Sequence, residues 1–136
     1  MENDVERALP SELIRRASLR GGEYAWQLHD IPEVIEAARA ARLVNIGGQL
    51  QFRLPDGGIC ECYWIEVDAL REVDAASPRE TIVQLSADAA QREFSSLPPP
   101  ESLLRQGRAS FDEHLGTAKI SDDDLSACMC FVWYFE

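Results

Sequence analysis

The sequence is short of basic residues, histidine and long apolar runs. Its 136 residues include 13 Lys and Arg against 24 Asp and Glu, which gives a formal net charge of −11. Nucleic-acid-binding proteins usually display a basic patch to the phosphates, so this imbalance argues against a nucleic-acid partner and favours a basic one. No stretch approaches the roughly 20 apolar residues of a membrane-spanning helix. The acidic start at Met1–Asp4 also argues against a secretion signal.

Cysteine is sparse and unevenly placed. The four cysteines form two C-x-C pairs, Cys60 with Cys62 and Cys128 with Cys130, unlike the dispersed framework of a small disulfide-bonded secreted protein. We therefore expect reduced thiols in a cytoplasmic protein. Four thiolates on neighbouring strands could bind zinc, but structural zinc sites usually take their ligands from turns with two to four residues between cysteines. Burial as small apolar side chains is the simpler interpretation, and no metal or other cofactor is predicted.

Catalytic residues are not evident either. The chain has two histidines, His29 and His114, and neither stands in a motif that predicts a neighbouring nucleophile. Paired carboxylates occur often, but 24 acids in 136 residues produce such pairs by chance. The glycine pair Gly47-Gly48 lacks the spacing and lysine of a phosphate-binding loop, and a strand bulge or close backbone approach explains it. We therefore expect that this protein is not an enzyme.

The chain is long enough for one domain, residues 1–136, with a single core. A short helix is predicted from Pro10 to Ala17, with Gly21-Gly22 supplying a helix stop. A second helix begins after Asp30, because Asp30 and Glu33 suit a capping box. Its apolar residues recur at intervals of three and four: Ile31, Val34, Ile35, Ala38 and Ala41.

Alternating side chains then predict two strands, 44–54 and 59–68. Pro55-Asp56-Gly57-Gly58 between them has the composition of a hairpin turn. Both sides of the second strand carry large apolar groups, which favours a place in the interior of the sheet. The chain ends with an apolar run, 125–135, which we predict to be a central strand.

The middle of the chain admits two interpretations. Ser77-Pro78-Arg79-Glu80 favours a helix over 79–94, whereas the β-branched alternation of Thr81–Leu85 favours a strand. Three prolines, 98–100, end this segment, a short helix at 101–106 follows, and the polar run 107–124 is predicted to be a surface loop. These elements predict an α+β fold: an antiparallel sheet with helices packed on one face.

The acids are concentrated in two segments that we predict to contact a partner. The first has six acids and one base, and the second includes three consecutive aspartates. The candidate contacts are Asp56, Glu61, Glu66, Asp68, Glu72, Asp74, Asp122, Asp123 and Asp124. Tyr24 and Trp26 are added because aromatic groups in a polar connection can anchor a partner. The alternatives are a solvated surface for the acids and core packing for the two aromatic residues.

Several of these segments resemble the small immunity proteins that bacteria encode beside secreted toxins. The likeness rests on Glu23-Tyr24-Ala25-Trp26, on Asp30–Ile35, on Gly47–Gly57 and on Tyr63-Trp64, in the first half of the chain. It implies a cytoplasmic inhibitor that neutralises a cognate toxin by tight binding, often over the toxin's active site. The charge independently favours this function, since acidic inhibitors associate faster with basic enzymes.

A second function remains open. A small ligand-binding domain or enzyme could use a pocket near Tyr24, Trp26 and His29. Such a protein would bind a small molecule without a protein partner.

Overall fold

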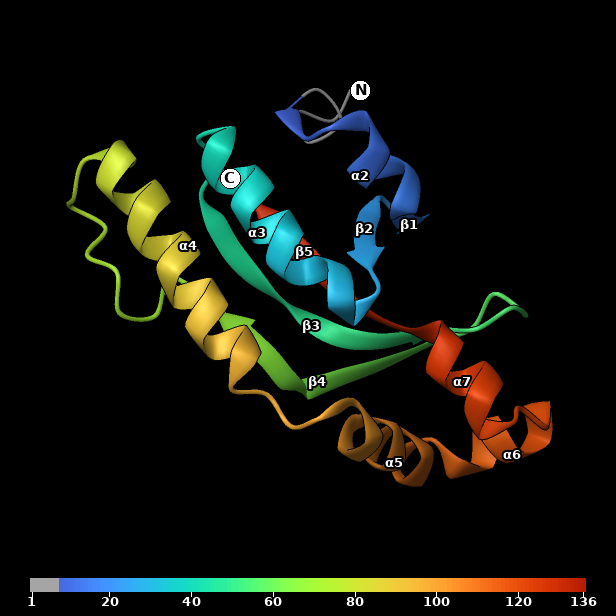
Figure 1. Ribbon diagram of the computed structural model, residues 1–136. Helices are drawn as coiled ribbons and strands as arrows, with labels where there is room; N and C mark the ends of the chain where they lie inside the picture. The colour runs from blue at the N-terminus through green and yellow to red at the C-terminus, as the bar shows by residue number, and fades with distance from the viewer. Residues whose placement is uncertain (1–7) are drawn as a thin grey trace.

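The computed structural model describes residues 8–136, so the acidic start at residues 1–4 lies outside the described part. It shows an α+β fold in which helices pack against a five-stranded antiparallel sheet (Figure 1), which confirms the predicted fold class. In chain order the elements are α2 (Ser11–Arg16), β1 (Ser18–Arg20), β2 (Glu23–Trp26), the 3-10 helix η1 (Leu28–Asp30), α3 (Ile31–Ala40), β3 (Asn45–Arg53), β4 (Ile59–Asp68), α4 (Arg79–Ser95), α5 (Pro100–Ser110), α6 (Asp112–Ala118), α7 (Asp122–Cys128) and β5 (Met129–Phe135).

The predicted hairpin is present as β3 and β4. Its glycine pair has a structural cause, because a Cβ on Gly48 would lie 1.7 Å from the carbonyl oxygen of Val132 on β5, and φ at Gly47 is +133°. The pairing register between β3 and β5 shifts between Asn45 and Gly47. The predicted bulge and close backbone approach are therefore confirmed.

The strand order is β1-β2-β5-β3-β4. The predicted central position of the last strand is confirmed, since β5 lies between β2 and β3. The predicted interior position of the second hairpin strand is wrong, because β4 is an edge strand. The prediction failed because Tyr63 and Trp64 were assigned to the core, whereas they are 63% and 49% exposed.

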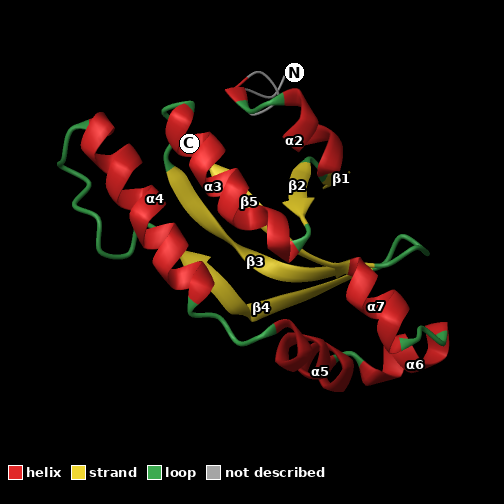
Figure 2. Cartoon of the chain, viewed as in Figure 1, coloured by secondary structure: helices red, strands yellow, loops and turns green. Residues whose placement is uncertain are grey.

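The core lies between the sheet and the helices α3 and α4 (Figure 2). The sheet contributes large fully buried side chains, among them Trp26, Phe52 and Phe131. The predicted apolar stripe of α3 is buried at Ile31 and Ile35. The helical interpretation of residues 79–94 is confirmed by α4, and the strand alternative is not adopted. The opposite face of the sheet carries a smaller apolar cluster around Val132.

The surface loop predicted over 107–124 is wrong. α5 continues to Ser110, and α6 and α7 follow it. The outer sides of these helices are polar. Their inner sides pack on the core through Leu103, Leu115 and Leu125, which are at most 1% exposed. Gly107 does not break α5, because it is the position at which the helix touches the ring of Phe52. The final strand is shorter than the predicted range 125–135, because residues 125–128 belong to α7.

Gly21-Gly22 does not end a helix as predicted. α2 ends at Arg16, and the glycine pair forms the turn of a small hairpin between β1 and β2, with φ of +58° and +77°. Among residues 8–136, no helix has both the length and the apolar character needed to cross a bilayer.

Candidate partner-binding surface

The six acids predicted on the hairpin and the following loop are spread along one side of the molecule. Asp56 lies in the turn before β4, and Asp74 lies in the loop after it. Since β4 has 10 residues and a strand rises about 3.3 Å per residue, its two ends are roughly 30 Å apart. Glu61 and Glu66 lie on β4, and Asp68 is its last residue. The acids therefore form a line along the sheet edge and not a compact cluster.

Three of these acids stabilise turns. The carboxylates of Asp56, Asp68 and Asp74 each accept a hydrogen bond from the backbone N–H two residues later, at 2.7, 3.2 and 2.9 Å. Asp is common in such turns because its short side chain reaches that N–H group. By contrast, Glu66 and Glu72 are exposed, and no side chain of residues 8–136 pairs with either carboxylate. Glu66 and Glu72 are therefore available to a partner.

Tyr63 is the most exposed large apolar side chain in the described part of the chain, at 63%. Its hydroxyl donates a hydrogen bond to the carboxylate of Glu61, which also accepts one from the Gln51 side chain at 3.2 Å. The hydrogen bond to Glu61 raises the pKa of Tyr63, so the phenol stays protonated at neutral pH. The ring is thus held in place while its faces remain open to solvent.

Trp64 is the second exposed aromatic residue of β4. Its ring stacks on that of Phe111, with centroids 6.3 Å apart and planes inclined by 25°. Its indole N–H donates to the side-chain oxygen of Gln106 on α5 at 3.1 Å. Two contacts on one side therefore fix Trp64, and about half of the side chain remains exposed.

Apolar exposure is concentrated on this strand. Residues 8–136 expose five large apolar side chains, and three of them, Ile59, Tyr63 and Trp64, belong to β4. As an edge strand, β4 has a partner on one side, namely β3. We define the β4 edge surface as Ile59, Glu61, Tyr63, Trp64 and Glu66. Tyr and Trp are enriched in protein interfaces, and an open strand edge offers unpaired backbone groups to a partner.

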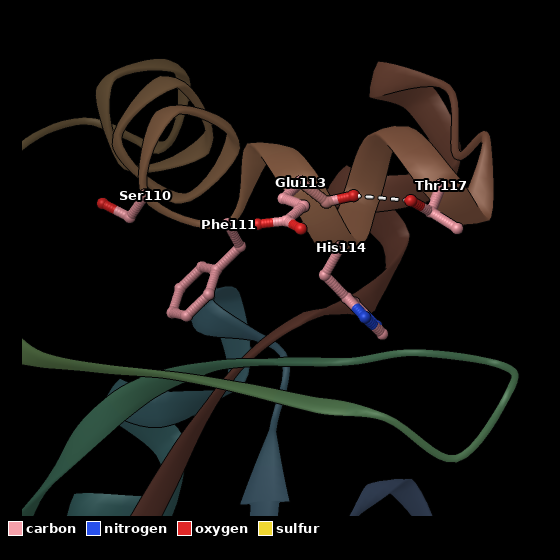
Figure 3. Close-up of a pocket in the computed structure, with 5 residues that line it drawn as sticks. All are labelled: Ser110, Phe111, Glu113, His114 and Thr117. Carbon is pink, nitrogen blue, oxygen red and sulfur yellow. Dashed lines mark hydrogen bonds between the residues drawn. The ribbon is translucent and has the colours of Figure 1, made fainter.

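A cavity of about 420 Å³ lies beside this surface, between the end of α5 and α6. It is lined by Ser110, Phe111, Glu113, His114 and Thr117. Figure 3 shows the Phe111 ring and the His114 imidazole pointing towards the β3–β4 hairpin. His114 lies 4.0 Å from the Asp56 carboxylate in the hairpin turn. Since Phe111 also stacks on Trp64, the cavity and the β4 edge surface share one aromatic wall.

The three consecutive aspartates occupy the first turn of α7. Ser121 caps this helix by accepting from the backbone N–H of Asp124 at 3.2 Å, and Asp122 pairs with Arg108 at 2.8 Å. Acids at this position also interact favourably with the helix dipole. The carboxylates of Asp123 and Asp124 have no partner among residues 8–136. The helix start explains the run of aspartates, and two of the three carboxylates remain available.

Tyr24 and Trp26 do not present a binding surface. Their exposed fractions are 6% and 0%, and the Trp26 indole N–H donates to the backbone carbonyl of Leu13 at 2.8 Å. Both residues belong to the main core, as the core-packing alternative states. We therefore remove them from the set of partner contacts.

The structure has a pocket at His29, but its other lining residues differ from those expected. An apolar cavity of about 510 Å³ is lined by Leu28, His29, Pro32 and the segment 94–100, together with Leu103, but neither Tyr24 nor Trp26 lines it. His29 is its one titratable residue, and the His29 side chain is 73% exposed. This cavity lacks the convergent polar groups that orient a small ligand or a reacting atom.

The cysteines do not converge. Cys60 and Cys62 belong to the core cluster on the helix side of the sheet, whereas Cys130 belongs to the cluster on the opposite face. Burial raises the pKa of Cys62 to about 12 and that of Cys130 to about 11, so both thiols are protonated at neutral pH. Within residues 8–136, no three His, Cys, Asp or Glu side chains are placed to share a metal ion.

The residues missed from the sequence are Tyr63 and Trp64, which adjoin the predicted acids. Their neighbours Glu61 and Glu66 were the available signal, since carboxylates are rarely placed next to buried aromatic rings. Comparison with protein-family models, curated proteins and solved structures finds no match for this chain.

Proposed function

We propose that this chain is an immunity protein that binds a basic cognate toxin and neutralises it by covering its active surface. The observation that carries the proposal is the β4 edge surface, where the exposed rings of Tyr63 and Trp64 lie on the same strand as the unpaired carboxylate of Glu66. Exposed aromatic groups beside carboxylates, in a chain of net charge −11, favour a protein interface over a merely solvated face.

Tyr63 and Trp64 supply the anchors of this interface. Tyr and Trp are enriched among the few residues that carry most of the binding energy in protein complexes. Here each ring is already fixed, Tyr63 by its hydrogen bond to Glu61 and Trp64 by its contacts with α5 and Phe111. A fixed side chain loses less conformational entropy on binding, which strengthens the complex.

The negative charge accelerates association with a basic partner and disfavours acidic partners. Of the nine acids predicted to contact a partner, four are exposed and have no partner among residues 8–136, namely Glu66, Glu72, Asp123 and Asp124. Such groups attract a basic protein before contact and accelerate association, an effect that added salt screens over about 8 Å at physiological ionic strength. Asp56, Asp68 and Asp74 keep their hydrogen bonds within the three turns. Their charges add to the negative potential that attracts the partner.

The cavity beside Phe111 fits a cationic side chain of the partner. It offers an aromatic face from Phe111 and the carboxylate of Glu113 on the same helical segment. An Arg or Lys side chain gains cation–π attraction from such a ring and an ion pair from the carboxylate. In this proposal the β4 edge surface and the cavity bind one basic segment together.

Neutralisation by this route requires binding alone. Steric and electrostatic coverage blocks the toxin while the chain itself performs no chemistry and needs no cofactor. The proposed contacts are thus Glu61, Tyr63, Trp64 and Glu66, with Glu72, Asp123 and Asp124 contributing charge.

The test begins with capture of the tagged chain from its native host, followed by affinity measurements on the purified partner. Two matched variants are compared, Glu66→Lys on β4 and Glu12→Lys on α2, since both change the net charge by the same amount. Glu12 is exposed and lies beside the opposite sheet edge. We expect Glu66→Lys to weaken binding at least tenfold, about 1.4 kcal/mol, and Glu12→Lys to leave it nearly unchanged.

Equal weakening in both variants would show that net charge alone drives association. No weakening in either, with a partner bound at 1:1 stoichiometry, would place the interface elsewhere on the molecule. Either result contradicts the β4 edge surface as the binding site.

A further inference from the structure

This acidic protein also has a basic cavity. It has a volume of about 200 Å³ and is bounded by the end of α2, by β1 and β3, and by the junction of α7 with β5. Three arginines line it, Arg16, Arg20 and Arg53, together with Ser18, Cys128 and Cys130. β1 and β4 are opposite edges of the sheet, but Arg53 pairs with Ile59 of the β4 edge surface and Arg20 donates to Gly58 beside it, so the two sites adjoin at the β3–β4 hairpin.

Arg53 is the unusual residue of this cavity, because it is a charged residue that is only 6% exposed. Nε donates to the side-chain oxygen of Gln51 at 3.0 Å, and Nη1 donates to the carbonyl oxygen of Ser18 at 2.6 Å and to its hydroxyl at 3.2 Å. Nη2 is buried, and no atom of residues 8–136 accepts a hydrogen bond from it. A buried, charged donor without an acceptor is costly and rare in folded proteins.

The cavity also lacks a counter-ion. Among residues 8–136, no carboxylate lies within 4.0 Å of the guanidinium of Arg53 or Arg20. Arg20 donates instead to the carbonyl oxygens of Leu54 at 3.0 Å and Gly58 at 3.4 Å. Arg16 is different, since it pairs with Asp30 and Glu33, both at 2.6 Å. Within residues 8–136, Arg20 and Arg53 therefore have no direct ion-pair partner, and Glu23 acts on Arg53 from a greater distance.

Burial is the main cause that lowers the pKa of Arg53, and the nearby charge of Arg20 lowers it further. A guanidinium nevertheless stays charged in proteins, because its intrinsic pKa is above 12. The local electrostatics consequently favour a negative group in the cavity.

We infer that this cavity binds a small oxyanion, a phosphate or a carboxylate, that is held by the charges of Arg53 and Arg20 and draws Nη2 of Arg53, which has no acceptor among residues 8–136, into a hydrogen bond. A guanidinium fork matches the oxygen spacing of both groups. The size fits, because about 200 Å³ is below the 300–1,000 Å³ of typical drug-sized ligand sites but above the roughly 30 Å³ occupied by one water molecule.

A bound oxyanion would connect separate elements. Ser18 and Arg20 belong to β1, Arg53 belongs to β3, and Cys130 belongs to β5. The ligand therefore fastens the small β1–β2 hairpin to the central strands. The inference does not rest on the proposed toxin binding, because no residue of the β4 edge surface lines this cavity.

The test is isothermal titration of the chain with inorganic phosphate and, separately, with acetate, each against sodium chloride at matched ionic strength. We expect saturable 1:1 binding of one of these anions. Arg53→Gln should weaken it at least tenfold, whereas Arg15→Gln, a matched change at an exposed position of α2, should leave it unchanged. Tighter binding of phosphate than of acetate would identify a phosphate ligand, and the reverse order would identify a carboxylate ligand.

Amide chemical shifts of the unmodified chain give a second readout that does not depend on the folding of a variant. Phosphate or acetate should shift the signals of Ser18, Arg53 and Cys130 and leave those of α4, which does not line the cavity, in place. The inference is overturned if neither anion binds saturably, if Arg53→Gln binds as tightly as the unmodified chain, or if the shifts are spread over the whole surface.

Discussion

Gly107→Ala offers a sharp test of how α5 packs on the sheet. Gly107 is buried within α5, and a Cβ at this position would lie 2.3 Å from Cε1 and 2.5 Å from Cζ of Phe52. Phe52 is fully buried, so its ring has no solvent-filled space into which it could move. The substitution therefore forces the helix and the sheet apart.

Two effects of opposite sign act at this position. Replacing Gly by Ala within a helix stabilises it by up to about 1 kcal/mol. Adding a group to a close-packed contact destabilises a protein by about 1–3 kcal/mol. We expect the packing effect to dominate, which leaves Gly107→Ala less stable than the unmodified chain by up to about 2 kcal/mol.

Gly116→Ala is the matched control. Gly116 lies within α6, and no atom comes within 4 Å of the position of its added Cβ. The helix effect is therefore retained without the packing cost, and Gly116→Ala should be as stable as the unmodified chain or slightly more stable. Urea denaturation of both variants measures the difference, which we expect to be about 1–3 kcal/mol. Equal stability of the two variants would refute the packing of α5 against Phe52.

Three further predictions concern the binding surface and the thiols. Tyr63→Ala should weaken partner binding by about 2 kcal/mol, roughly 30-fold, while the melting temperature stays nearly constant, because the side chain is 63% exposed. Stopped-flow association with the partner should slow as sodium chloride is raised, with little change in the dissociation rate. The raised pKa values of Cys62 and Cys130, about 12 and about 11, mean that the unfolded chain loses these protons first, so the free energy of unfolding should fall as pH rises above about 8.5. Urea denaturation between pH 7 and pH 10 measures this slope, and Cys62→Ala should remove part of it.

Periodic patterns made the central elements predictable. The spacing of Ile31, Val34 and Ile35 places one stripe of α3 on the core, and the alternation along β3 matches its pairing with β4 and β5. The α3 pattern arises because one side of the helix is buried, whereas β3 is buried on both sides, at Phe52 on one and at Gln51 and Arg53 on the other, so its predicted half-exposure is wrong. The helix start at Pro78 likewise decided α4 against the β-branched alternation that followed it.

Elements fixed by a few distant contacts were not predictable. α6 and α7 each have one fully buried side chain, Leu115 and Leu125, so their polar residues outnumber the apolar ones and suggest a loop. The edge position of β4 depends on which strands pair with β5, and residue order does not encode that choice. Large apolar side chains on both sides of a strand fit a buried position and an exposed binding edge equally well.

The candidate site shows the same division. Composition identified the acidic segments, but the fold decides which carboxylates are free, since Asp122 is paired with Arg108 while Asp123 is not. Arg53 could not be singled out in advance, because its isolation depends on side chains from β1 and β5. The sequence therefore shows which residues are charged, whereas the fold determines which of them are paired and which are buried.

Protection of living cells tests the central claim most directly. The captured partner is expressed in its host together with the unmodified chain, with the double variant Tyr63→Ala and Trp64→Ala, or with Glu12→Lys, and growth is measured at equal levels of the three proteins. We expect growth with the unmodified chain and with Glu12→Lys, and arrest with the double variant. Arrest in all three cases, or growth with the double variant, would contradict neutralisation through the β4 edge surface.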